Sequence, residues 1–149
     1  MHNEKKDPLE AAVLVDQATK QNRVRKLLAD ILRGRVEIDS NGDLELLPET
    51  YKLSVADIIL IFLCGKLAQK LLLEKLESGK TEISERISQK DIIEFLTTID
   101  PGTIKASLHN LRNKNLIRKE EGKNFVSPPQ LQKIKDRLSN SAKGEEKDV

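Results

Sequence analysis

The chain has 149 residues, with 26 Lys and Arg against 24 Asp and Glu, one Cys and no Trp. This length is typical of one domain, or of one domain with an appendage, and it is sufficient to bury a core without a disulfide or a metal ion. A composition of 38% apolar and 34% charged residues excludes collagen-like, mucin-like and disulfide-scaffold proteins. Clustered Leu and Ile residues also exclude disorder over the whole chain.

Nothing in the sequence indicates export or a membrane anchor. The polar N-terminus lacks the apolar region of a signal peptide. The longest apolar run, Ile58–Cys64, is shorter than the roughly 20 residues that span a bilayer. Cys64 lies inside this run, where it is expected to be a small core residue rather than a nucleophile. We therefore expect a cytoplasmic protein with no membrane partner.

The charge is unevenly distributed along the chain. Lys20–Arg35 contains six bases and one acid, whereas Val36–Thr50 contains five acids and no base. Thr103–Lys123 is again basic, with six bases and two acids. Separate patches of one sign influence partner choice more than the net charge of +2 does. The alternative is that these patches are only solvated helix faces.

Residues 8–53 are predicted to form an N-terminal extension, after a disordered end at 1–7. Pro8 suits the first turn of a helix, and the apolar residues that follow at helical spacing fit either one long helix or two shorter ones that end at Gly34. Two alternating runs around Asn41-Gly42 then predict a β-hairpin closed by Pro48.

The helical part of this extension, residues 8–34, is amphipathic and cannot bury its apolar stripe alone. It is expected to fold back on the next helix or to pair with a second copy of the chain, and we favour a homodimer. The acidic hairpin is expected to point away from a polyanionic partner or to meet a basic one. The extension's bases are candidate phosphate contacts: Arg23, Arg25, Lys26, Arg33 and Arg35.

A long core helix is predicted over Val55–Glu77, opened by Ser54 with Asp57 as a capping-box-like partner and ended by Ser78-Gly79. Its segment Ile58–Cys64 is apolar on every face and is expected to be buried all round.

A short strand or extended connection follows over Thr81–Ile87. Ser88 and Asp91 then predict the start of a second helix, and Asp100-Pro101 the start of a third that ends near Asn115. The predicted inward residues are Ile92, Ile93, Phe95 and Leu96 in the second helix, and Ile104, Leu108 and Leu111 in the third.

The remaining pattern predicts strand Leu116–Glu121, a turn at Glu121–Lys123, and a return strand Asn124–Ser127. A last helix begins at Ser127-Pro128-Pro129, with Leu131, Ile134 and Leu138 inward, and residues 141–149 are predicted to be a disordered tail.

Residues 54–140 resemble the winged helix-turn-helix superfamily of bacterial and archaeal transcriptional regulators. The resemblance rests on the element order and on the run Thr103–Arg118, which reads TIKASLHNLRNKNLIR. It differs from the usual pattern in having Asn115 where Gly is common, acids in the wing, and a longer first helix. The resemblance implies a mainly α fold with small β-hairpins, in which helix 101–115 enters the DNA major groove and the wing, 116–127, supports it.

The face of helix 101–115 opposite its apolar stripe carries small and amide side chains. Small residues allow close approach to a groove, and Asn can pair bidentately with adenine. Bases at the sides of this face and in the wing suit phosphate contacts. The predicted DNA-binding residues are Thr103, Lys105, Ala106, His109, Asn110, Arg112, Asn113, Lys114, Arg118, Lys119 and Lys123.

The main alternative is a winged-helix module that binds protein as an adaptor or assembly subunit. No catalytic residue is predicted, because the sequence has no glycine-rich phosphate loop, nucleophile elbow or paired-carboxylate motif. His2 and His109 lack partners at metal-ligand spacing, so no metal or other cofactor is expected. The four aromatic residues are too few for a single-strand stacking platform.

Overall fold

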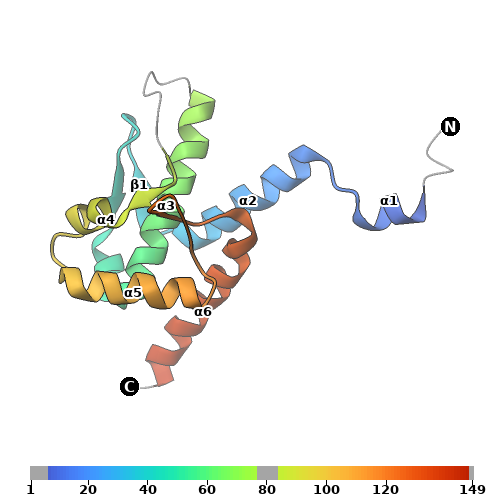
Figure 1. The fold of residues 1–149 in the computed structure, drawn as a ribbon. Helices are drawn as coiled ribbons and strands as arrows, with labels where there is room; N and C mark the ends of the chain where they lie inside the picture. The colour runs from blue at the N-terminus through green and yellow to red at the C-terminus, as the bar shows by residue number, and fades with distance from the viewer. Residues whose placement is uncertain (1–6, 77–83, 148–149) are drawn as a thin grey trace.

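The computed structural model describes the backbone of residues 7–76 and 84–147, and the side chains of all of these except 74–76 and 141–147. It confirms a mainly helical chain with small antiparallel hairpins (Figure 1). In chain order the elements are α1 (Pro8–Val13), α2 (Gln17–Leu32), β1 (Val36–Ile38), β2 (Leu44–Leu46), the 3-10 helix η2 (Pro48–Lys52), α3 (Val55–Leu76), β3 (Ile87–Ser88), α4 (Gln89–Phe95), α5 (Pro101–Asn113), β4 (Arg118–Glu120), β5 (Lys123–Phe125), the 3-10 helix η3 (Pro128–Gln130) and α6 (Leu131–Lys147).

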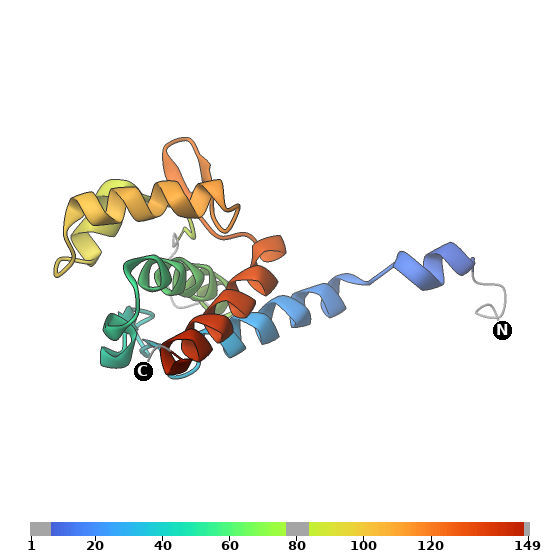
Figure 2. The same cartoon turned by 90° about the horizontal axis from the view of Figure 1, so that it is seen from below.

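Helix α3 is the centre of the fold, and the predicted core segment Ile58–Cys64 is buried on every face. Figure 2 shows α5 on one side of α3 and α2 with α6 on the other. Ser54 caps α3 as predicted, because its Oγ accepts a hydrogen bond from the amide of Asp57 at 3.2 Å. The predicted return half of the capping box is wrong, since the Asp57 carboxylate instead accepts from Nε of Arg137 at 2.8 Å.

Cys64 is fully buried in α3, as expected of a core residue. Removal of the thiol from water raises its pKa to about 12, because burial penalises the thiolate. We therefore expect the native protein to be inert to a disulfide thiol reagent at about pH 8, where the unfolded chain in urea reacts with one equivalent. The absorbance of the released thiolate measures both reactions, and a full equivalent of reaction in the native protein would contradict this buried position.

The N-terminal extension forms two helices rather than one. Helix α2 packs against α3 and α6 and buries Leu28 and Ile31, so this part of the extension folds back on the core helix. Helix α1 contributes no buried residue. Gly34 has φ +77° and follows the end of α2 as predicted. Arg35 donates to the carbonyl of Ile31 at 2.7 Å and so closes α2, which is a structural role that the phosphate-contact hypothesis did not include.

The predicted hairpin is present, with Val36 opposite Leu46 and Glu37 opposite Glu45. Its turn differs from the expected two-residue Asn-Gly turn, because Gly42 has a positive φ of 86° and Asn41 does not. The amide of Gly42 donates to the carbonyl of Asp39 at 2.9 Å, which is typical of a three-residue loop with glycine last. Nε2 of the buried Gln69 donates to the Gly42 carbonyl at 2.6 Å and fastens this turn to α3.

The second sheet has the strand order β3-β5-β4, so the short strand before α4 extends the hairpin that follows α5. Of the predicted strand at Thr81–Ile87, the structure places Ile87 in β3. Residues 77–83, including the expected helix stop Ser78-Gly79, lie outside the described residues.

The predicted inward position of Phe95 in α4 is wrong. Its side chain is 37% exposed at the edge of the core, where its ring centroid lies 4.4 Å from that of Phe62. Ile92 is the one fully buried residue within α4, and Leu96 at its C-cap is also fully buried.

The ends of the last elements also differ from the expectation. Strands β4 and β5 are shorter than predicted, and β5 begins one residue earlier, at Lys123. Glu121 and Gly122 both take positive φ and form the turn. Helix α6 continues through Lys147, so the predicted boundary at 140 lies inside a helix rather than at the start of a disordered tail. Residues 1–6 of the predicted disordered end lie outside the described residues. Over the described helices, none is long and apolar enough to cross a membrane.

Candidate nucleic-acid interface

An N-cap, a proline in the first turn and a buried apolar stripe define the start of α5 and its inward face. The side chain of Asp100 accepts from the amide of Thr103 at 3.0 Å, and Pro101 occupies the first turn. Ile104, Leu108 and Leu111 are at most 1% exposed and pack toward α3. This stripe fixes the rotation of α5, so the opposite face is turned outward.

The outward face of α5 carries the predicted groove-contacting residues together. The structure leaves six of the predicted side chains on this helix exposed, among them small, amide and basic groups. The ring Nε2 of His109 lies 3.1 Å from the amide nitrogen of Asn113, so these two side chains support each other one turn apart. The exposed set is Thr103, Lys105, Ala106, His109, Asn110 and Asn113, with Lys114 at the C-cap.

Arg112 does not stand at the edge of this face as a simple phosphate contact. Its guanidinium donates to Oδ1 of Asn124 at 3.0 Å and is half-buried. Asn124 itself is 1% exposed in the middle of β5. The pair therefore joins α5 to the wing, and Arg112 positions the hairpin. Sequence reasoning missed Asn124, because a lone Asn in a short strand carries no signal of its partner.

One acid of the β4–β5 hairpin, the predicted wing, is neutralised by two arginines. Glu120 pairs with Arg86 at 2.8 Å and with Arg118 at 3.5 Å. The guanidinium of Arg86 also lies 4.5 Å from the ring centroid of Phe125. Arg118 is therefore partly committed to the wing itself, and Arg86 is a residue of this site that the sequence did not reveal.

The two predicted wing lysines lie on opposite faces of the hairpin. The register places Lys119 opposite Asn124, and Lys123 opposite Glu120. Because side chains alternate along a strand, Lys119 shares the face of Asn124, and Lys123 lies on the other face. Both are exposed. Asn124 is bonded to Arg112 of α5, so Lys119 lies on the hairpin face that is continuous with α5, and Lys123 does not.

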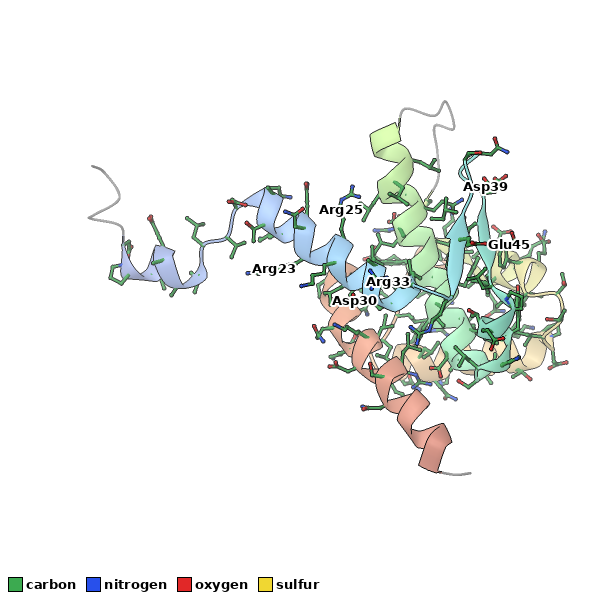
Figure 3. All side chains as sticks on the ribbon, turned by 180° about the vertical axis from the view of Figure 1, so that it is seen from behind. Arg23, Arg25, Asp30, Arg33, Asp39 and Glu45 are labelled. Carbon is green, nitrogen blue, oxygen red and sulfur yellow. The ribbon has the colours of Figure 1, made fainter. Side chains whose placement is uncertain are left out.

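The basic residues of α2 do not extend the α5 surface. Helix α2 lies on the far side of α3 from α5 in Figure 2. Figure 3 shows Arg23, Arg25 and Arg33 along α2, with the acidic side chains of the β1–β2 hairpin beyond α3. Arg25 reaches the carbonyl of Leu71 at 3.5 Å, which directs it over the junction between α2 and α3.

Within the described side chains there is no group of three or more His, Cys, Asp or Glu residues placed to hold a metal ion. No family model, curated protein or solved structure matches the chain.

Proposed function

We propose that the chain is a winged-helix protein that binds double-stranded DNA and regulates transcription, with α5 in the major groove. The outward face of α5 is the observation that carries this proposal. This face combines small side chains and side-chain amides, and Lys side chains flank it. Side-chain amides of this kind hydrogen-bond to the edges of nucleobases, whereas Lys and Arg side chains contact phosphates.

The order of elements supports a winged helix-turn-helix. Helices α4 and α5 are joined by residues 96–100 only, and the β4–β5 hairpin follows α5 directly. Strand β3 adds to β5, so the wing is held as the edge of a three-stranded sheet rather than as a lone hairpin. A two-stranded hairpin is marginal alone, so this third strand and the bond from Arg112 to Asn124 give the wing a defined position beside α5.

The chemistry of α5 suits a groove more than a protein surface. Ala106 and Asn110 are both exposed and lie four residues apart, so they share one helix face. A small residue beside an amide allows the helix to approach base edges closely, and Asn pairs bidentately with adenine. Lys105 in the second turn of α5 and Lys114 at its C-cap are exposed, where they could contact the phosphate backbones.

Binding of the full chain to a mixed-sequence duplex tests the proposal. Fluorescence anisotropy should show binding at ~50 mM salt that weakens as salt rises, with a log–log slope of about −3 if Lys105, Lys114 and Lys119 each contact a phosphate. Absence of binding at ~50 mM salt would overturn the proposal and leave the protein-adaptor alternative.

A further inference from the structure

We infer that two copies of the chain exchange their N-terminal segments, so that α1 of each copy fills an apolar groove on the other. The groove is a hollow of about 500 Å³ between α2, β1 and α3. We call it the α2–α3 groove. Its larger apolar side chains are Leu28, Leu32, Val36, Ile38, Leu71 and Leu72.

Helix α1 has an apolar stripe that none of the described residues of its own chain buries. Leu9, Val13 and Leu14 are 65–67% exposed, and Leu72 in the groove is 38% exposed. Figures 1 and 2 both show α1 projecting away from the body of the fold. A helix of six residues is far shorter than the roughly 12–15 that an isolated helix needs, so its stability depends on packing against another surface.

The charges of the segment and of the groove are complementary. The segment 7–16 carries Asp7, Glu10 and Asp16 and no base. The rim of the groove carries Arg25 and Arg33. Glu10 is three residues before Val13 and so borders the apolar stripe of α1. With the stripe seated in the groove, an acidic edge of α1 lies against a basic rim.

The far end of the groove, near Leu32 and Val36, is out of reach of α1 in the same chain. Leu32 lies about 22 Å from Gln17 along α2, at 1.5 Å per residue. Helix α1 is about 9 Å long, and residues 14–16 must make the reversal if it folds back. Folded back, α1 would cover only the first two turns of α2, beside a smaller hollow lined by Lys20, Val24 and Leu67. The α2–α3 groove near Leu32 and Val36 is therefore available to a second copy, in a reciprocal arrangement with two-fold symmetry.

Sedimentation equilibrium of the full chain tests the exchange. We expect the wild-type protein to have the mass of two chains, and both Leu9→Asp/Val13→Asp and Leu72→Asp to have the mass of one. Tyr51→Asp is the matched control. The exposed fraction of Tyr51, 41%, is similar to that of Leu72, and Tyr51 lies on η2 outside the groove. It should remain dimeric. A monomeric wild-type chain would overturn the inference. So would dimers that persist in both Leu9→Asp/Val13→Asp and Leu72→Asp.

Cross-linking separates exchange from fold-back and does not depend on variants that lose stability. An equimolar mixture of Leu9→Cys and Leu72→Cys chains, treated with a short bis-maleimide, should give a covalent pair that contains one chain of each kind. The buried native Cys64 does not interfere. A mixture of Leu9→Cys with Tyr51→Cys is the control and should give no such pair above background. A double variant, Leu9→Cys/Leu72→Cys, that cross-links within one chain at high dilution would overturn the inference in favour of fold-back.

Discussion

Replacing both Lys105 and Lys114 by Glu is expected to weaken duplex binding about 100-fold at ~50 mM salt and to reduce the log–log salt slope by about 2. Both side chains are exposed on or beside α5, so their reversal removes two phosphate contacts and adds repulsion without disturbing the core. Arg112 is unsuitable for this test, because its loss would also release the wing from Asn124. Anisotropy titrations at several salt concentrations measure both quantities, and circular dichroism confirms that helicity is retained.

The matched control for this variant is Lys20→Glu with Lys26→Glu. It changes the net charge of the protein by the same amount, but both residues are exposed on α2, on the other side of α3 from α5. Its affinity should stay within about threefold of the wild type at ~50 mM salt, because the distant charges are largely screened. Equal losses in the two double variants would show that binding follows net charge alone and would remove α5 from its assigned role.

Arg137→Ala is expected to lower the free energy of unfolding by about 3 kcal/mol. The side chain of Asp57 is 3% exposed at the start of α3, and Nε of Arg137 is the donor that reaches its Oδ1 at 2.8 Å. Without Arg137 the Asp57 carboxylate is left buried without its ion-pair partner. Urea unfolding followed by circular dichroism measures the change.

Two further variants decide whether burial is the cause of this loss. Lys52→Ala breaks an ion pair with Glu49 whose side chains are 71% and 75% exposed, and it should cost less than about 1 kcal/mol. Replacing the buried pair together, as Asp57→Leu with Arg137→Met, should recover most of the stability because no unpaired charge remains. If Arg137→Ala cost no more than Lys52→Ala, the ion pair would have no special role in joining α6 to α3.

The elements whose boundaries the sequence predicted well are those with local signals. Ser54, Ser88 and Asp100 each cap the helix that follows, and the apolar period set the inward stripe of α5. Asn115 takes φ +60° at the end of α5, as its tolerance of the left-handed region predicts. Such signals lie within a few residues of one another, so they can be recognised before the chain is folded.

The parts that could not be predicted depend on partners far along the chain. Asp57 and Arg137 are 80 residues apart, and no local pattern distinguishes Arg137 from the other bases of α6. The same holds for Arg112 with Asn124, which changes one predicted phosphate contact into a positioning residue. Phe95 was misplaced for a related reason, because helical spacing shows that a residue borders the core but not whether a neighbour covers it.

The cross-strand placement of Glu37 beside Glu45 has a consequence for solubility. Among the described residues this sheet consists of the two strands β1 and β2, so each strand has an outer edge at which a strand of another chain can pair. Two carboxylates directly opposite each other slightly weaken the hairpin, but they also repel any strand of like charge that approaches either edge. The hairpin thus resists edge-to-edge aggregation, and neutralising both acids with Gln should promote amyloid-like association of concentrated protein.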